Sequence, residues 1–212
     1  MKKVIFVLAV LFGMLAFFSC SSNIKDAKLN VRIVDAPITL KNGLVAEEVN
    51  VVIKRVDVLK KGSCEENATQ AKDGDGVFTV LETDITLNLL DYQNGASYLL
   101  GSVTLEAGEY LQLRLVVDSN SSTIKFQDDN ASYYLKVPSG GQSGIKIKGN
   151  ARNPLFTIEE GEEADLVFDF DVMNSIKVHQ TNKDKYILRP VIKEIRYRNR
   201  ILTGFETKDI IK

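Results

Sequence analysis

Three aspartates at alternate positions have the clearest potential for metal chemistry in this sequence. Asp165, Asp169 and Asp171 stand at i, i+4 and i+6 of a run in which apolar and polar residues alternate. If 164–172 is a strand, the three carboxylates share one face, and carboxylate oxygens are ligands that calcium prefers. Alternate strand positions are about 6.5 to 7 Å apart, so neighbouring carboxylates would share an ion only with help from loop groups. A solvated acidic face is the simpler interpretation. We therefore predict no cofactor, with these aspartates as the candidates for a calcium site if one exists.

Nucleophilic catalysis has little material to work with. A Ser-His-Asp mechanism needs a histidine as general base, and His179 is the only histidine in the chain. It follows Val178 on an expected strand, a position typical of a surface residue. The stretch 141–144 does not match the Gly-x-Ser-x-Gly nucleophile motif, because its second glycine, Gly144, stands one place too near the serine. Asp73-Gly74-Asp75-Gly76 resembles half of a calcium loop without the closing Glu, and is more typical of a tight turn. We expect no enzymatic activity.

Two other groups of residues could contact a ligand. Tyr92 and Tyr98 flank a predicted turn, and tyrosine rings either stack on sugars or fill a hydrophobic core. They are the candidate ligand-binding residues. Arg196, Arg198 and Arg200 would line one face of a strand, where they could meet lipid head groups or an anionic glycan. The same charges could instead protect an edge strand against aggregation.

The first twenty residues predict an exported, lipid-anchored protein. Lys2 and Lys3 precede fifteen uncharged residues, 4–18, which as a helix would span only about 22 Å of a bilayer core of about 30 Å. This favours a signal peptide over a permanent membrane helix. Ser19-Cys20 at its end resembles the bacterial lipobox, in the relaxed form of Bacteroidetes lipoproteins, where the cysteine thiol is acylated and the peptide is cut before it. An ordinary secretory peptide is the alternative.

Acylation of Cys20 would set both the location and the cysteine chemistry. Several acyl chains anchor a protein stably to a membrane. The remaining cysteine, Cys64, would then have no partner for an internal disulfide. The residue after Cys20 is Ser21 rather than aspartate, and in this the chain resembles lipoproteins that are passed to the outer membrane. We expect a cell-envelope protein that its N-terminal lipid holds at the outer membrane, with an unidentified protein or glycan partner.

Alternating hydrophobicity over most of the remaining chain predicts strands. The pattern is clearest in 109–118 and 164–172, while 49–59 is rich in β-branched residues, as in a buried central strand. Turn residues separate about a dozen short strands, so we predict an all-β fold: a single antiparallel β-sandwich of immunoglobulin-like or transthyretin-like Greek-key type. The expected organisation is a signal peptide at 1–19, a tether at 20–28, the sandwich at 29–205 and a C-terminal tail at 206–212.

An ordered series of short motifs gives the sequence a family resemblance. The motifs are Asp35-Ala36-Pro37, Val49-Asn50-Val51, Leu89-Leu90-Asp91, Ala107-Gly108-x-Tyr110, Val137-Pro138-Ser139-Gly140, Asp169-Phe170-Asp171 and Leu188-x-Pro190-Val191-Ile192. Their order resembles the bacterial exported-lipoprotein domain of unknown function 4382, over about residues 29 to 195. The resemblance implies a secreted, lipid-anchored β-domain and supplies no catalytic residues.

Composition narrows the function further. The 27 Lys and Arg residues nearly balance 28 Asp and Glu residues, which argues against a nucleic-acid binder. The leading hypothesis is a non-enzymatic, lipid-anchored binding or interaction module. The alternatives are a pilin-like or surface-assembly subunit, with 201–212 as donor strand, and an envelope hydrolase that uses His179 and Asp169.

Overall fold

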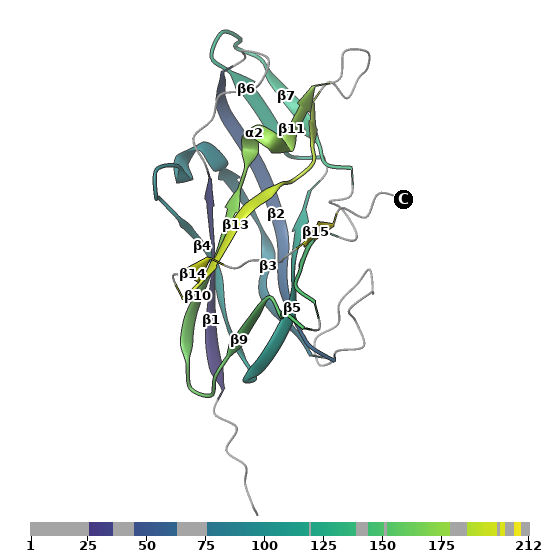
Figure 1. Ribbon diagram of the computed structural model, residues 1–212. Helices are drawn as coiled ribbons and strands as arrows, with labels where there is room; N and C mark the ends of the chain where they lie inside the picture. Colours follow the sequence, from purple (N-terminus) through teal and green to yellow (C-terminus); the bar gives the residue numbers. More distant parts are fainter. Residues whose placement is uncertain are drawn as a thin grey trace, which may run out of the picture.

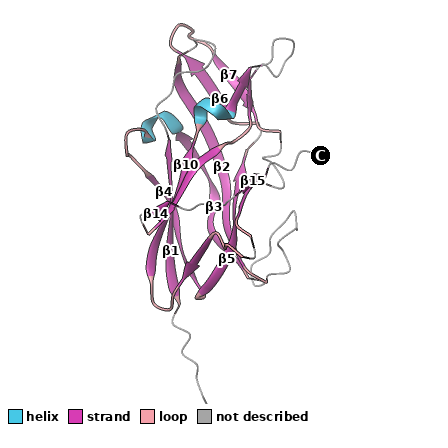
Figure 2. Cartoon of the chain, viewed as in Figure 1, coloured by secondary structure: helices cyan, strands magenta, loops and turns pink. Residues whose placement is uncertain are grey.

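The protein is built from two β-sheets with very little helix. A computed structural model describes residues 26–35, 45–62, 76–118, 120–138, 144–150, 152–178, 186–198, 200–201 and 206–208. The strands lie in two layers along the length of the molecule, and two single-turn helices stand near one end (Figures 1 and 2). The predicted signal peptide at 1–19, Cys20, Cys64 and His179 lie outside the described residues.

The smaller sheet has five strands in the order β14-β13-β10-β1-β4. Their bounds are β1 Ala27–Asp35, β4 Tyr98–Leu105, β10 Glu163–Phe170, β13 Ile192–Tyr197 and β14 Arg200–Ile201. Strand β1 pairs antiparallel with β4 and parallel with β10. Alternate residues of β1, from Leu29 to Ile33, are completely buried, and the residues between them lie on the other face of the sheet. The predicted period-two pattern thus places one face of this sheet in the core.

The larger sheet has ten strands arranged around the long strand β2. Their bounds are β2 Ala46–Lys60, β3 Val77–Asn88, β5 Gly108–Val117, β6 Thr123–Phe126, β7 Ser132–Lys136, β8 Ile145–Lys148, β9 Phe156–Ile158, β11 Ile176–Val178, β12 Tyr186–Leu188 and β15 Glu206–Lys208. Strand β2 pairs with β3 along one edge and with β5 and β6 along the other. This confirms the prediction that 49–59 forms a central strand.

The two sheets share one hydrophobic core. A single cluster of buried residues draws on both sheets, and a stack of three rings joins them: the centroids of Tyr110 and Phe156 are 4.9 Å apart, and those of Phe156 and Tyr197 are 5.2 Å apart. The sheets also approach closely beside β4. A Cβ atom at Gly101 would lie 2.4 Å from the backbone oxygen of Val80 on β3, so this contact requires glycine.

The all-β prediction is confirmed, but the purely antiparallel arrangement is wrong. Strand β1 runs parallel to β10, and β7 runs parallel to β12, so both sheets are mixed. Alternating hydrophobicity identifies a strand and its buried face but not the direction of its partner, because pairing is decided by residues far away in the chain. The immunoglobulin-like or transthyretin-like Greek key stays a prediction.

Several boundaries also differ from those expected. Strand β1 begins at Ala27, so Ala27 and Lys28 belong to the body rather than to a tether that ends at residue 28. Strand β15 lies in the predicted tail 206–212, where its backbone pairs with β8. One long strand, β3, covers Val77–Asn88 and is followed directly by the 3-10 helix η1 at Leu89–Tyr92.

Candidate functional site

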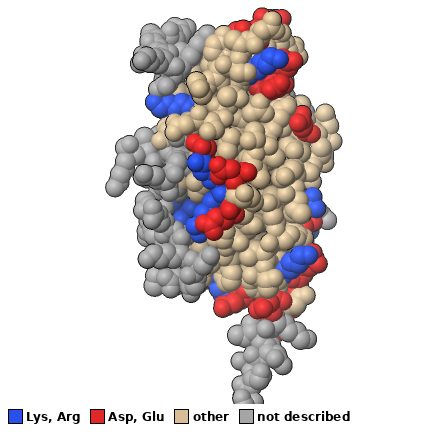
Figure 3. Space-filling view, turned by 180° about the vertical axis from the view of Figure 1, so that it is seen from behind, with Lys and Arg blue, Asp and Glu red and all other residues tan. Residues whose placement is uncertain are grey.

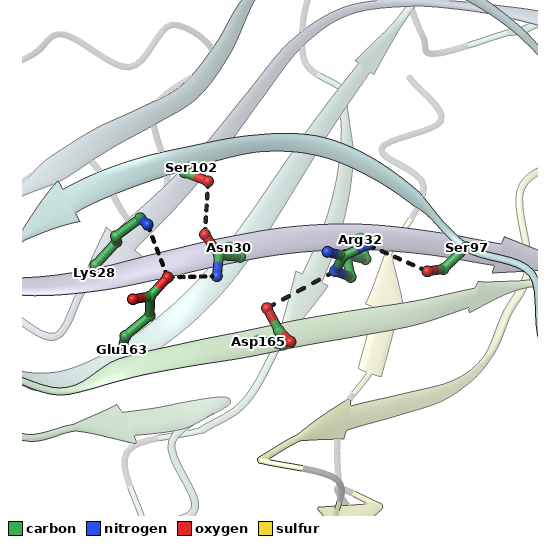
Figure 4. Close-up of polar contacts among 7 residues, drawn as sticks. All are labelled: Lys28, Asn30, Arg32, Ser97, Ser102, Glu163 and Asp165. Carbon is green, nitrogen blue, oxygen red and sulfur yellow. Dashed lines mark hydrogen bonds and ion pairs between the residues drawn. The ribbon is translucent and has the colours of Figure 1, made fainter.

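The outer face of the five-stranded sheet, which we name the small-sheet face, carries a network of polar side chains. It consists of Lys28, Asn30 and Arg32 on β1 with Ser97, Ser102, Glu163 and Asp165 beside them (Figure 4). Strand pairing sets Lys28 opposite Glu163 and Asn30 opposite Asp165. These residues alternate with the buried residues of β1 and β10, so they point away from the core.

Hydrogen bonds connect this network across three strands. The Nζ of Lys28 lies 2.7 Å from Glu163 Oε1, and the Nδ2 of Asn30 donates to the same oxygen at 3.2 Å. The hydroxyl of Ser102 on β4 donates to Asn30 Oδ1 at 2.6 Å. The hydrogen bond from Lys28 is the main cause that lowers the pKa of the Glu163 carboxyl. The folded structure therefore favours the ionised form of Glu163.

The second half of the small-sheet face is more loosely held. Arg32 donates from Nη1 to the hydroxyl of Ser97 at 3.4 Å, and its Nε lies 3.8 Å from Asp165 Oδ1. The Asp165 side chain is 51% exposed. Water screens a pair of this kind, which contributes about 0 to 1 kcal/mol. These side chains can therefore exchange their present partners for groups on another molecule at low cost.

The three candidate calcium ligands do not come together. Asp165 and Asp169 share the outer face of β10, as predicted, but that strand ends at Phe170, so placing Asp171 on the same face is wrong. Asp171 is buried and caps the helical turn α2 (Val172–Ser175), accepting hydrogen bonds at 3.0 Å and 2.7 Å from the backbone and side-chain nitrogens of Asn174. In the described part of the chain, no group of three or more His, Cys, Asp or Glu residues could hold a metal ion.

Asp169 is the unusual member of this set. It is partly buried, and within the described ranges its Oδ1 has no hydrogen-bond partner. Burial is the main cause that raises the pKa of its carboxyl, and the charges of Asp171 and Glu194 act in the same direction. Lys193 and Arg196 oppose the shift. Two carboxylates on one strand thus have pKa values shifted in opposite directions, Glu163 downward and Asp169 upward.

Tyr92 and Tyr98 do lie against each other, but not beside the aspartates. Their ring centroids are 5.5 Å apart in an edge-to-face arrangement, and both rings pack against the hydrophobic core. Tyr98 pairs with the buried Ile33, whereas Arg32 and Asp165 point to the other face of the sheet. The two tyrosine rings and the acidic residues therefore lie on opposite faces of this sheet. This favours the interpretation that the rings fill the hydrophobic core.

The predicted arginine strip is also divided. Strand β13 ends at Tyr197, and Arg198 has a φ of 52° in the turn that leads to β14. The guanidinium of Arg198 pairs with Glu162, and Arg196 pairs with Glu194 at 3.1 Å. The arginines therefore do not form one cationic row, because a tight turn interrupts the strand.

The outer face of the ten-stranded sheet, which we name the large-sheet face, is the polar region that the sequence pattern did not reveal. Strand pairing aligns Thr79, Asp57, Arg114 and Lys146 in one row, with Leu59 and Gln112 in the next. Asp57, Gln112, Arg114 and Lys146 are between 0% and 2% exposed. Alternation places them away from the shared core, but they are as buried as core residues.

Asp57 is held through only one of its oxygens. Its Oδ1 accepts hydrogen bonds from Arg55 Nε at 2.7 Å and from the Thr79 hydroxyl at 3.0 Å. Its Oδ2 is buried and accepts none from the described residues. Burial is the main cause that lowers the pKa of the Lys146 amine, and repulsion from Arg114 and Lys148 adds to it.

Gln112 stands out in the same region, because neither Nε2 nor Oε1 of its buried amide has a hydrogen-bond partner in the described structure. A buried polar group that lacks a partner costs about 1 to 3 kcal/mol. Asp57 Oδ2 and the two amide atoms of Gln112 are three such atoms on one face. Their combined cost would be large compared with a typical free energy of unfolding of about 5 to 15 kcal/mol. Each of these atoms therefore lowers the stability of the fold unless a water molecule supplies its missing hydrogen bond.

One sequence signal could have pointed to this face. Asp57 interrupts an otherwise β-branched run in a strand predicted to be buried on both sides, and a charge there needs a partner. Arg114 and Lys146 give no such signal, because they alternate with leucine and isoleucine as exposed residues do. Tyr110 precedes Gln112 by two positions, but the pairing of β2 with β5 shifts register beside Leu59, and Tyr110 lies in the core.

Comparison with known proteins identifies one matching family but no matching curated protein or solved structure. Among the described residues, no helix has the length and apolar character required to cross a membrane. No curated protein and no solved structure matches the chain. Residues 26–190 match the family described as Domain of unknown function (DUF4382), a stretch that runs from the start of β1 to just beyond β12. The family resemblance of the sequence motifs is thereby confirmed, and the chain belongs to the DUF4382 family.

Proposed function

We propose that this protein is a non-enzymatic, lipid-anchored binding module of the cell envelope, of the Bacteroidetes lipoprotein type. The observation that carries the proposal is the short interval between Cys20 and β1. Ala27 is seven positions after Cys20, with six residues between them, and seven steps of extended chain span at most about 25 Å. Strand β1 is paired on both edges, so an acyl chain on Cys20 would connect directly to the rigid body rather than to a long linker.

The charges at the anchored end support the same proposal. Four ion pairs surround the start of β1: Lys28–Glu163, Lys60–Glu106, Lys61–Glu109 and Arg198–Glu162. Each of these four basic groups is matched by a carboxylate, so among the residues that the structure describes they form no unpaired basic cluster that would attract anionic lipids. Stable membrane attachment normally takes two signals, and here the acyl chains on Cys20 would have to provide both.

The small-sheet face is the surface that we assign to partner binding. Its polar side chains are exposed and weakly paired, and Leu99 adjoins them with 42% of its surface exposed. Such a surface suits a polar partner, a protein or a glycan, because its hydrogen-bonding groups can be re-paired without uncovering a core. Seen from behind, the surface of the molecule also carries acidic and basic residues next to one another (Figure 3).

Acylation is tested by mass spectrometry of the mature N-terminus after expression of the full chain in a host that processes bacterial lipoproteins. The expected product begins at Cys20 and carries acyl groups. Cys20→Ser should move the protein from the membrane fraction to the soluble fraction, while the matched control Cys64→Ser should leave it in the membrane. An unmodified Cys20, or cleavage at another bond, would overturn the proposal.

A surface-assembly subunit is the weaker alternative. That function needs a spare donor strand, and part of the only candidate segment, Glu206–Lys208, pairs with β8 of the same chain. The hydrolase hypothesis gains nothing from the described residues either, because Asp169 lies among basic and acidic neighbours rather than beside a nucleophile.

A further inference from the structure

The outer face of strands β7, β12 and β11, which we name the tip face, carries an exposed aromatic ring beside exposed cations. Strand pairing aligns Lys136, Ile187 and Lys177 in one row, and Tyr134 stands two positions before Lys136 on β7. Tyr134 and Lys136 alternate with the buried Leu135, so this row points away from the core. Tyr134 is 77% exposed, more than any other large hydrophobic residue that the structure describes. Its ring is therefore open to contact with another molecule.

The charge of the tip face is positive. Strands β7, β11 and β12 contain no Asp or Glu residue. Lys177 is exposed, as is Arg189, which directly follows β12 and by alternation shares the face of Ile187. Within the described ranges, neither Lys177 nor Arg189 has a carboxylate partner. The partner that complements this charge is an anion.

The position of the tip face argues against a lipid partner. Strand β1 begins at the opposite end of the molecule from β7 and β11 (Figure 1). An anchor at Cys20 would therefore hold the tip face away from the head groups of its own membrane. This step rests on the proposed lipid anchor, whereas the positive charge and the exposed ring do not depend on it.

The spacing of the cations and the hydroxyl groups around the ring favour an acidic polysaccharide. Neighbouring strands are about 4.8 Å apart, so the backbones of Lys136 and Lys177, two strands apart, are separated by about 10 Å. A chain that carries carboxylates on successive sugars can pair with several such cations at once. Thr123 is the strand partner of Tyr134, and Ser132 stands two positions before it, so hydroxyls flank the exposed ring. Sugars have C–H groups that pack on an aromatic ring and hydroxyls that bond to such side chains.

We propose that the tip face binds a carboxylated polysaccharide, whose sugar rings pack against Tyr134 and whose carboxylates pair with Lys177 and Arg189. Lys136, which has further contacts of its own, adds positive charge beside them. This surface is separate from the small-sheet face. An acidic protein segment is the competing partner, because it offers the same carboxylates but no sugar ring for the tyrosine.

The test measures binding of the full chain, kept in non-ionic detergent, by isothermal titration calorimetry. The probes are polygalacturonate and alginate, with poly-L-glutamate as an acidic peptide and dextran as an uncharged polysaccharide. At least one of the two acidic polysaccharides should bind about tenfold more tightly than poly-L-glutamate or dextran. The proposal would be overturned if neither acidic polysaccharide bound, or if poly-L-glutamate or dextran bound equally tightly. Acylation of Cys20 is measured separately by mass spectrometry, so the failure of one proposal is distinguishable from the failure of the other.

Three matched variants locate the binding surface. Tyr134→Ser and Lys177→Gln should each weaken polysaccharide binding about fivefold, through loss of the ring and of one cation. Lys193→Gln removes the same charge from an exposed position on β13 and should change the affinity by less than about twofold. All three positions are exposed, so thermal unfolding should show that each variant keeps its fold. Equal losses of affinity in the three variants would show that net charge alone drives binding, and would overturn the assignment to the tip face.

Discussion

The small-sheet face and the large-sheet face are built from the same kinds of residues but differ in exposure. Both place acidic, basic and amide side chains at alternate strand positions. On the small-sheet face, Lys28 and Glu163 are more than half exposed, so water compensates any lost contact. On the large-sheet face, Asp57 and Gln112 are almost completely buried, and each hydrogen bond that is missing there has a cost. The exposure of a polar side chain, rather than its residue type, therefore decides how much its substitution changes the free energy of unfolding.

Removal of Asp57 should have the largest effect. Asp57→Ala removes the closest carboxylate of the partly buried Arg55 guanidinium, which keeps Glu82 at 3.3 Å, and the loss of hydrogen bonds to a charged group should cost about 2 kcal/mol. The matched variant on the small-sheet face, Asp165→Ala, should change the free energy of unfolding by no more than about 0.5 kcal/mol. Urea denaturation of both variants measures the difference. Equal losses would contradict the comparison between the two faces.

Gln112→Leu should have a smaller effect of the opposite sign. It replaces a buried amide that has no partner by an apolar side chain of similar size, which should raise the free energy of unfolding by about 1 kcal/mol. The control is Gln127→Leu, at an exposed position, which should be close to neutral. Thermal unfolding of the two variants and the unchanged protein provides the measurement. A destabilised Gln112→Leu protein would indicate that ordered water already satisfies the amide.

The pH dependence should distinguish two carboxylates of the small sheet. The pKa of Asp169 is raised, so its contribution to stability is complete at low pH and is lost as the pH rises through the folded-state value. The pKa of Glu163 is lowered, so its contribution is complete above the ordinary glutamate pKa and is lost as the pH falls. Asp169→Asn should therefore stabilise the protein at neutral pH, and Glu163→Gln should not. Carbon-detected NMR titration should find the Asp169 pKa above 3.8 and that of Glu163 below 4.5; the reverse order of shifts would contradict this assignment.

The smallest effect is expected for the pair of Arg32 and Asp165. Its atoms are 3.8 Å apart and both side chains are at least one-third exposed, so a double-mutant cycle should give a coupling below about 0.5 kcal/mol. Added salt should reduce that coupling further, because exposed charges are screened. A coupling well above this value would show that the small-sheet face is more rigid than its exposure indicates.

Much of the local structure was predictable from the sequence. The alternation in 164–172 located β10 and put Asp165 and Asp169 on its outer face, and the β-branched run identified β2 as central. Asp171 was misplaced because the strand stops one residue earlier, where the aspartate caps α2. A cap and a strand position both accept aspartate, so the residue type alone does not distinguish them.

The sequence by itself determined that this chain forms an all-β body, which residues alternate between the faces of its strands, and to which family it belongs. These properties depend on local periodicity and on the order of short motifs. Only the tertiary structure decided that β1 pairs parallel with β10, that Tyr98 faces the core, and that Asp57 and Gln112 are buried on a face directed away from it. Strand partners and the burial of an outer face arise from contacts between residues distant in the chain, and a period of two contains no information about them.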